Sequence, residues 1–411
     1  MTVLDYLIET GKKVSAPCGG NGTCKGCLID AKMPSGEVKR LLACQTEYIE
    51  GMEIILPEND LEILGANKIA GTFGARNFVA VDIGTTTVAM ALVDGKTGEI
   101  ISETGFSNSQ RVYGADVISR IAASNSGKKD ELQKLIIRDI KKGLDKLGDS
   151  YERIVISANT TMMHLFLGLS CEKLGTFPFT PETLSPEDTI ISELSDKPIS
   201  FVPGISAFVG GDIVSGILSL PTDGYSMLID LGTNGEMVLW NEDNYFVTST
   251  SAGPAFEESR LSYGSDSISK LASYLQNGII NECGLIEDEE ASDISGEDVA
   301  KLQLAKSAIR TGIDLLLERT NTYPDEVKHL YIAGGFGKNL DVMDAVTIGL
   351  IPSEMAGVSI AIGNSSLDGA IRFGLRNESR EDTAKIIKKA IKVDLANDPK
   401  FNDLFSSNMM F

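Results

Sequence analysis

The chain has 411 residues, of which 42% are hydrophobic and 23% are charged, and its formal net charge is −21. This length and apolar fraction indicate a globular protein of two to three domains, each able to bury a core. The strong negative charge argues against a nucleic-acid partner, and no export signal is visible, so we expect a cytoplasmic protein.

The first predicted element is a short helix over Val3–Ile8, followed by a loop rich in glycine and cysteine. Four of the six cysteines lie in residues 18–44 with the spacing C-x5-C-x2-C-x16-C, and a strand near residues 52–57 closes the segment. These cysteines are Cys18, Cys24, Cys27 and Cys44. A disulfide framework is not expected in a large acidic chain without an export signal, so the cluster indicates a metal site.

Three of the four clustered cysteines share one glycine-rich loop, and the fourth is remote in the sequence. Such a loop lets backbone amides surround an anionic cluster while four thiolates hold two irons. Zinc sites, the alternative, usually show two separate pairs of cysteines. The pattern therefore favours a [2Fe–2S] cluster over zinc. We interpret the two isolated cysteines, Cys171 and Cys283, as small core residues.

The cysteine stretch resembles the plant-type and adrenodoxin-type ferredoxins, and its x5 spacing is of the latter kind. The resemblance implies a small α+β module over residues 1–57, followed by a linker over residues 58–76. The sequence begins at the ferredoxin helix without the preceding β-hairpin of those families. We therefore expect the module to lean on the large domain or on the second subunit of a homodimer. The linker is long enough for the module to move.

From residue 77 onward, one pattern of turn residues occurs twice. Asp82-Ile83-Gly84-Thr85-Thr86 lies between two apolar runs, and so does Asp230-Leu231-Gly232-Thr233-Asn234-Gly235-Glu236. Each predicts a strand, a tight turn and a strand. Turn amides and threonine hydroxyls can bind phosphate oxygens, and the aspartate can hold Mg²⁺ or its water shell. One copy could be an ordinary hairpin, but two copies favour a duplicated phosphate-binding element.

Several further elements follow the first turn. We predict an amphipathic helix over residues 128–147, a buried strand over 153–157 and an irregular, proline-rich connection over 175–200. His164 stands alone at a helix start, where a structural role is more common than a catalytic one. The most apolar long stretch, residues 199–220, contains a proline, four glycines and an aspartate, which indicates a buried segment rather than a membrane span.

After the second turn, residues 251–257 form another glycine turn that contains Gly253. A long helix is predicted over residues 298–320, and Lys306 and Arg310 lie four residues apart on it, which is typical of a solvated face. The last predicted helix lies near residues 384–391 and precedes a polar tail.

The two turns, together with Ile332-Ala333-Gly334-Gly335, resemble the actin, sugar kinase and heat-shock ATPase superfamily, called ASKHA. In that superfamily two related lobes each present one hairpin to the phosphates of ATP. The resemblance implies a two-lobed α/β fold of the RNase H-like type, with lobe one over residues 77–200. Lobe two would span residues 201–380, with a C-terminal helix and tail completing the domain to residue 411.

Two stretches rich in small residues, 205–218 and 364–374, resemble the connecting helices of the same superfamily. Small residues let two helices cross closely, which suits a hinge or, alternatively, tight packing without motion. The resemblance also gives Lys306 and Arg310 a second interpretation, because basic residues of this helix contact adenine in the heat-shock ATPases.

The ASKHA resemblance implies roles for single residues. Asp82 would bind Mg²⁺ through water, and Asp230 would orient the attacking water, with Glu236 as a second candidate for that task. The phosphates of ATP would lie against Gly84, Thr85, Thr86, Gly232, Thr233 and Asn234. Gly253 would lie in the loop near the nucleotide, and Gly334 and Gly335 would contact adenosine.

The fusion of an iron–sulfur module with an ATPase predicts ATP-gated electron transfer, because an ATPase needs no one-electron centre and a ferredoxin needs no ATP. The order of elements resembles the reductive activators of corrinoid proteins, over roughly residues 1–57 and 78–405. This resemblance implies ATP-dependent reduction of Co(II) to Co(I) in a corrinoid protein of methyl transfer, with an upstream electron donor. The longer family members carry a separate middle domain, for which this sequence has no room.

Three other functions remain open from the sequence. One is an activator of another low-potential enzyme, of the 2-hydroxyacyl-CoA dehydratase type, although such activators carry a [4Fe–4S] cluster between subunits. A small-molecule kinase with a vestigial metal module would phosphorylate an acceptor without the cluster. A redox sensor would use ATP only as a switch.

Overall fold

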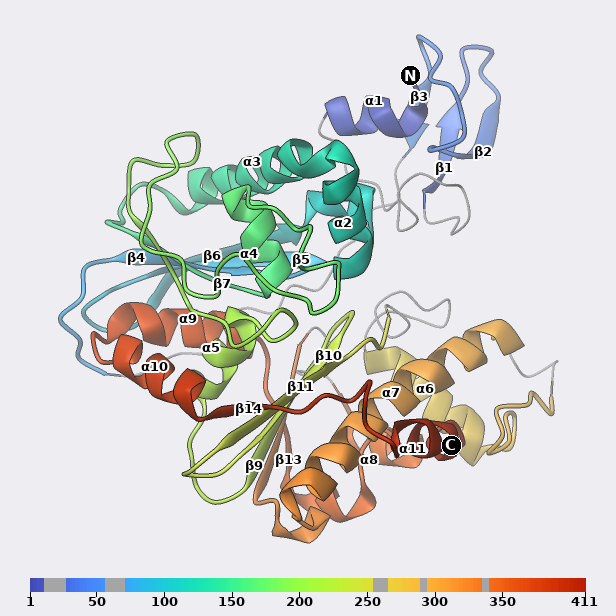
Figure 1. Ribbon diagram of the computed structural model, residues 1–411. Coiled ribbons are helices and arrows are strands. Elements are labelled where there is room, and N and C mark those ends of the chain that lie inside the picture. The colour runs from blue at the N-terminus through green and yellow to red at the C-terminus, as the bar shows by residue number, and fades with distance from the viewer. Residues whose placement is uncertain (11–26, 56–70, 254–264, 289–293, 335–339) are drawn as a thin grey trace.

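The computed structural model describes residues 1–10, 27–55, 71–253, 265–288, 294–334 and 340–411. Three β-sheets organise them: a small N-terminal sheet and one larger sheet in each of two lobes (Figure 1). The predicted site residues Cys18, Cys24 and Gly335 lie outside the described residues, as does most of the predicted linker.

The N-terminal module packs helix α1 (Val3–Glu9) on a three-stranded antiparallel sheet of order β2-β1-β3. Its strands are β1 (Leu28–Lys32), β2 (Val38–Leu42) and β3 (Glu53–Ile55). Thr2 and Asp5 form a capping box that begins the helix. The apolar face of α1 packs with Ile29 and Ala43 in a core of its own. The predicted helix and closing strand are confirmed.

Lobe one contains a five-stranded sheet of order β6-β5-β4-β7-β8, in which β4, β5 and β6 are antiparallel and β7 and β8 run parallel to β4. The strands are β4 (Phe78–Ile83), β5 (Thr87–Val93), β6 (Ile100–Ser107), β7 (Ile154–Ala158) and β8 (Ile199–Phe201). The helices are η1 (Ser109–Tyr113), α2 (Val117–Ala123), η2 (Ser124–Lys128), α3 (Lys129–Leu147) and α4 (Thr160–Leu167). The predicted amphipathic helix is α3, whose apolar face covers this sheet.

Lobe two contains a six-stranded sheet of order β13-β12-β9-β10-β11-β14. The strands are β9 (Ser226–Leu231), β10 (Gly235–Trp240), β11 (Tyr245–Thr250), β12 (His329–Ala333), β13 (Ser359–Ala361) and β14 (Ala390–Lys392). The helices are α6 (Ser265–Gln276), α7 (Gly296–Thr320), η3 (Pro324–Glu326), α8 (Val342–Thr347), η4 (Ser353–Val358) and α11 (Phe401–Ser407). None of the helices in the described ranges is long and apolar enough to cross a membrane.

The two large sheets repeat one topology. The order β6-β5-β4-β7-β8 in lobe one corresponds to β11-β10-β9-β12-β13 in lobe two, with antiparallel and parallel pairs in the same places. In each lobe the predicted phosphate turn joins the first two strands. The predicted two-lobed, RNase H-like α/β fold with a small α+β module is therefore confirmed.

Two connecting helices, α5 (Gly211–Ser219) and α9 (Ser365–Leu375), lie between the lobes (Figure 1). Helix α9 packs on the sheet of lobe one, whereas α5 also contacts the sheet of lobe two. They cross closely, because a Cβ atom on Gly369 would lie 2.0 Å from the carbonyl oxygen of Ser215. The predicted close crossing of small-residue helices is confirmed.

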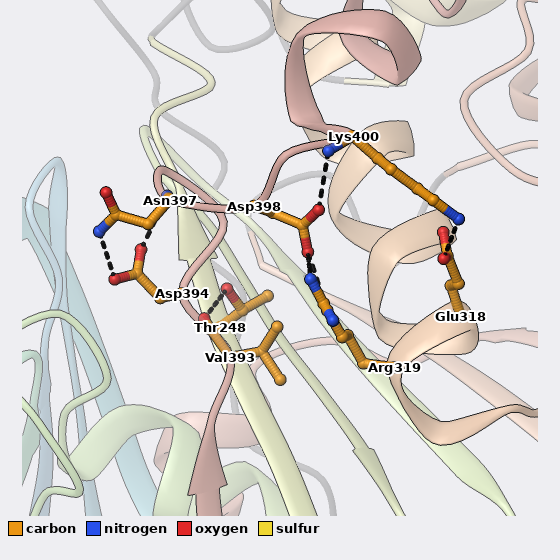
Figure 2. A network of polar contacts seen from close by, with 8 residues as sticks. All are labelled: Thr248, Glu318, Arg319, Val393, Asp394, Asn397, Asp398 and Lys400. Carbon is orange, nitrogen blue, oxygen red and sulfur yellow. Dashed lines mark hydrogen bonds and ion pairs between the residues drawn. The ribbon is translucent and has the colours of Figure 1, made fainter.

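The last predicted helix is partly wrong. Helix α10 spans Ser379–Lys389, earlier in the chain than expected, and residues 390–392 form strand β14, which pairs in parallel with β11. The segment after β14 then lies along α7 (Figure 2). Asp398 is paired with Arg319 of that helix, and Lys400 with Glu318. Backbone pairing at a sheet edge here overrides the helical pattern of the sequence.

Candidate functional site

The two predicted phosphate turns face each other across the lobes. Thr86 Oγ1, in the β4–β5 turn, lies 3.4 Å from Thr233 Oγ1, in the β9–β10 turn. Within the second turn, the amide of Gly232 donates to the carbonyl of Asn234 at 3.0 Å. The structure thus brings together two turns that are far apart in the sequence, and a group between them could be bound from both lobes.

The first turn is held from behind by three side chains. Asn108 Nδ2 donates to the carbonyl of Gly84 at 2.9 Å, and Asn159 Nδ2 donates to Thr85 Oγ1 at 3.1 Å. The fully buried guanidinium of Arg120 donates to the carbonyl of Thr85. Because these bonds fix the backbone of the turn, its remaining amides and hydroxyls are preorganised for a ligand.

Asp82, at the end of β4, is held by the start of helix α9. Ser366 Oγ donates to Asp82 Oδ1 at 2.7 Å, and Asn364 Nδ2 donates to Asp82 Oδ2 at 2.9 Å. Burial raises the pKa of Asp82 above its usual value, and the two hydrogen bonds oppose that shift. The carboxylate therefore keeps a fixed orientation at a site where an additional cation would relieve the cost of its charge.

Further carboxylates lie close enough to Asp82, or to one another, for their charges to affect each other's pKa. Burial and then the charge of Asp82 raise the pKa of Asp212, at the start of α5, to about 7. Burial also raises the pKa of Glu236 well above its usual value, with added repulsion from Asp212 and Asp230. Asn234 Nδ2 donates to Glu236 Oε1 at 3.2 Å. The predicted catalytic residues Asp82, Asp230 and Glu236 are therefore brought into one acidic region, and Asp212 joins them.

Such an acidic region suits a divalent cation that arrives with an anionic ligand. In the described residues, no group of three or more histidine, cysteine or acidic side chains is close enough together to hold a metal ion. Mg²⁺ commonly keeps several waters and is shared between one or two carboxylates and the phosphates of a substrate. The acidic region would offer such an ion charge from the protein side, with the rest of its coordination left to water and phosphate.

Gly334, directly after strand β12, lies close to the second turn. Its φ is +94°, and a Cβ atom there would lie 2.3 Å from the carbonyl of Leu231 and 2.6 Å from Asp230 Oδ1. Only glycine fits so close to the second turn. Gly253 has a φ of +72° and follows β11, whose residue Thr250 pairs with Gly235. Both predicted glycines thus follow strands that pair with β9 or β10, the two strands that the second turn joins.

A second candidate site lies in the N-terminal module. The Sγ atoms of Cys27 and Cys44 are 3.2 Å apart, and both side chains are buried. The Cys44 amide lies 3.5 Å from Cys27 Sγ, and Gln45 Nε2 lies 3.7 Å from Cys44 Sγ. Two thiolates on one tetrahedral metal with bonds of about 2.3 Å are about 3.7 Å apart, so this pair needs little change to share one ion. The nearby N–H donors suit sulfur atoms that carry negative charge.

The predictions for the two isolated cysteines and His164 are confirmed only in part. Cys171 is buried as predicted, but Cys283 is exposed, so its interpretation as a core residue is wrong. His164 is fully buried; its Nδ1 donates to the carbonyl of Thr160 at 2.7 Å and its Nε2 accepts from the amide of Glu182 at 3.1 Å. The structural role of this histidine is confirmed.

The basic pair on α7 does not form a solvated face. Lys306 is only 1% exposed, and its ammonium donates to the carbonyl of Met410 and lies 5.3 Å from the centre of the Phe411 ring. Arg310 Nε donates to Asp314 Oδ1 at 2.9 Å. The prediction of a solvated face was wrong because the C-terminal segment covers this part of α7.

Four residues of this site, Asp212, Arg120, Asn364 and Ser366, were not predicted from the sequence. Asp212 and Ser366 lie in the stretches of small residues that predicted the connecting helices, and a polar residue in such a stretch was the available signal. Arg120 had no comparable signal, because only the fold brings α2 behind the first turn.

Two family models match consecutive parts of the chain. One, described as the RACo middle region, matches residues 78–223, and the other, described as the C-terminal domain of RACo, the ASKHA domain, matches residues 224–275 and 285–411. The model of the middle region therefore falls on lobe one rather than on a separate domain.

Two curated proteins and one solved structure are similar over most of their length. The corrinoid activation enzyme RamQ of Eubacterium limosum is 27% identical over 100% of this chain and 96% of its own. The [Co(II) methylated amine-specific corrinoid protein] reductase of Methanosarcina barkeri is 21% identical over 81% of this chain and 76% of its own. The structure of a reductive activator for corrinoid, iron–sulfur protein has 24% identity and a TM-score of 0.74, covering 100% of this chain and 95% of its own.

Proposed function

This chain belongs to the RACo family, the reductive activators of corrinoid proteins, and from this premise we propose that it reduces the Co(II) form of a corrinoid protein by one electron. The reaction would depend on ATP, and an upstream donor would replace the electron that this protein gives to the corrinoid. The product would be the Co(I) form, which can accept a methyl group again.

The observation that carries this proposal is that one chain holds both a close pair of buried thiols and two facing phosphate turns. The Cys27 and Cys44 sulfurs are 3.2 Å apart in the module, and the Thr86 and Thr233 hydroxyls are 3.4 Å apart between the lobes. A nucleotide enzyme without redox function would need only the second feature.

Cys27 and Cys44 would share one iron of a [2Fe–2S] cluster, and Cys18 and Cys24 would hold the other. The cluster would supply a carrier for single electrons. The protein would contribute burial, which keeps water from the sulfurs, and N–H donors from the Cys44 backbone and the Gln45 side chain, which stabilise their charge.

At the other site, ATP would bind between the turns, with its phosphates against Gly84, Thr85 and Thr86 on one side and Gly232, Thr233 and Asn234 on the other. Asp82 would face Mg²⁺ through water, and Asp230, or alternatively Glu236, would orient the attacking water. Gly334 and Gly335 would lie at the adenosine. Hydrolysis then needs no covalent step on the protein, because positioning and charge neutralisation lower the barrier.

The proposal is tested by anaerobic mixing of the reconstituted protein with a reductant, ATP and a Co(II) corrinoid protein. We expect the Co(I) absorption spectrum to appear only when ATP is present, and the corrinoid protein to accelerate ATP hydrolysis. Asp230→Ala should stop both while leaving the visible spectrum of the cluster unchanged. A protein that binds no iron after reconstitution, or no adenine nucleotide, would refute the proposal.

A further inference from the structure

A chain of buried hydroxyl groups connects Asp82 to the crossing of helices α5 and α9. Ser366 Oγ, which bonds Asp82 Oδ1 at 2.7 Å, also lies 2.8 Å from Ser157 Oγ, and Ser157 Oγ lies 2.9 Å from Ser215 Oγ. Ser157 and Ser215 are fully buried, and Ser366 is 4% exposed. The three serines come from α9, β7 and α5, so the chain runs from the phosphate turn into the connection between the lobes.

When Asp82 is ionised, its carboxylate fixes the direction of these hydrogen bonds. A carboxylate only accepts, so the single hydroxyl proton of Ser366 points to Asp82. Ser366 must then accept from Ser157, and Ser157 must accept from Ser215. In a buried network each bond polarises the next, so a change at Ser215 alters how firmly Ser366 holds Asp82.

The far end of the chain of hydroxyl groups lies where the connecting helices touch. Ser215 is the residue whose carbonyl oxygen would be 2.0 Å from a Cβ atom on Gly369. Helix α9 packs on the sheet that contains Ser157, so α5 cannot slide past α9 without moving the Ser215 hydroxyl relative to Ser157.

We propose that Asn364, Ser366, Ser157 and Ser215 are positioning residues that orient the Asp82 carboxylate toward Mg²⁺ and make this orientation depend on how α5 and α9 cross. The inference rests on the proposed ATPase function, since it takes Asp82 as the residue that faces the metal. It adds that metal binding and the relative position of the lobes are linked through named hydroxyl groups.

The neighbouring residue Ser365 provides a control for the purely structural effect of removing a buried hydroxyl group. Ser365, next to Ser366 on the same helix, is 2% exposed, and its hydroxyl has no hydrogen-bond partner within the part of the chain that the structure describes. Ser365→Ala and Ser366→Ala therefore remove the same atom from the same buried helix turn, but only the second removes a bond to Asp82.

The test uses the full chain with a non-hydrolysable ATP analogue and Mn²⁺ as the probe metal, whose free form is counted by electron paramagnetic resonance. We expect Ser366→Ala to weaken Mn²⁺ binding about tenfold or more, because a hydrogen bond to a charged group is worth roughly that factor. Binding of the analogue without metal should change less than about twofold, well below that factor. Ser365→Ala should leave both constants at their wild-type values.

Two further variants test the far end of the hydroxyl network and leave the hydrogen bond between Ser366 and Asp82 in place. Ser157→Ala and Ser215→Ala should each weaken Mn²⁺ binding by about threefold, since the bonds they remove are between neutral groups. The chain's single tryptophan, Trp240, packs with Ile213 and Ile217 of α5, so its emission should respond to Mn²⁺ and analogue in the wild type and less so in Ser215→Ala.

The outcomes separate this inference from the proposed function. If the wild type binds metal and analogue but Ser366→Ala binds Mn²⁺ as tightly as Ser365→Ala, the positioning role is refuted and the ATPase proposal stands. The same holds if Ser366→Ala fails to fold while Ser157→Ala and Ser215→Ala bind Mn²⁺ normally. A wild-type protein that binds no adenine nucleotide refutes both.

Discussion

At the residue scale, the two candidate sites place charge in different surroundings. Cys27 and Cys44 lie in the small core of the module, where N–H donors already approach their sulfurs. Between the lobes, burial instead raises the pKa of Asp212 and Glu236, and repulsion from neighbouring acids adds to that effect. This difference fits the proposed function, in which the thiol pair would hold a permanently bound cluster and the acids would bind a cation that arrives and leaves with the nucleotide.

Substitution of Cys44 tests the thiol pair. We expect Cys44→Ser to abolish the visible absorption of the reconstituted cluster, because one of the four proposed ligands would be lost. Cys171→Ser is the matched control: burial raises the pKa of that thiol to about 11, and it lies in the core of lobe one. Normal iron content and absorption in Cys44→Ser would show that this residue is not a ligand.

The pH dependence of stability tests Asp212. An unfolded aspartate ionises near pH 3.9, whereas in the fold burial and the charge of Asp82 raise the pKa of Asp212 to about 7. Between these values the folded protein holds one more proton than the unfolded chain at this site. The free energy of unfolding therefore falls as pH rises from about 4 to about 7, and the loss persists above that range.

Asp212→Asn removes this loss, because the amide does not ionise. We expect the nucleotide-free variant to unfold at a higher temperature than the wild type at pH 8, with a difference that narrows toward pH 5. The exposed Asp149 provides the control, and Asp149→Asn should follow the wild type at every pH. Parallel curves for Asp212→Asn and the wild type would contradict the assignment.

At the scale of elements, the C-terminal segment is an integral part of lobe two. Strand β14 extends the sheet, and Thr248 Oγ1 of β11 donates to the carbonyl of Val393 at 2.9 Å just beyond it (Figure 2). Asp398 then accepts from Arg319, and at the far end Lys306 binds the carbonyl of Met410. The segment thus lies along much of α7, in contact with both halves of that helix.

Two ion pairs of this segment differ in burial, so we expect their removal to lower the free energy of unfolding by different amounts. Asp398 has a buried side chain, and although burial favours its neutral form, the Lys400 amide and Arg319 keep its pKa below the usual value. Because Arg319 is half exposed, we expect Asp398→Ala to cost about 1–2 kcal/mol of stability. The exposed pair of Lys400 and Glu318 should be worth less than about 0.5 kcal/mol, so Lys400→Ala is the control. Chemical denaturation monitored by Trp240 fluorescence measures both, and equal costs would contradict this account.

At the scale of the whole molecule, the features that could be predicted from the sequence are those that are local or repeated. The paired turns at Asp82 and Asp230 are short patterns whose strands follow from their apolar runs, and their repetition indicated two lobes. Lying in a small-residue stretch was the only signal for Asn364 and Ser366, and it did not indicate what they or Arg120 bind. Their partners are distant in the sequence and meet only where α9 packs against β4 and where Arg120 reaches the turn after β4. The tail was misread for the same reason: β14 forms because the edge of β11 is available.

The close crossing of α5 and α9 gives a prediction for the molecule as a whole, because both lobes are connected through it. A methyl group on residue 369 would meet the backbone of Ser215 and force the helices apart. Alanine favours a helix over glycine by about 1 kcal/mol, but overpacking against rigid backbone typically costs about 1–3 kcal/mol. We therefore expect Gly369→Ala to lower the unfolding temperature and to weaken nucleotide binding, which needs both lobes at once.

Gly357 is the matched control for this substitution, because a Cβ atom there would have no atom within 4 Å. Gly357→Ala should leave the unfolding temperature and nucleotide affinity near their wild-type values. Calorimetry of both variants, with and without an ATP analogue, distinguishes a local from a global effect. If Gly369→Ala loses stability but binds the analogue normally, the crossing holds the fold together without governing the approach of the lobes. Loss of both, with Gly357→Ala unaffected, is expected of a hinge, because widening the contact between the two helices also displaces one phosphate turn from the other.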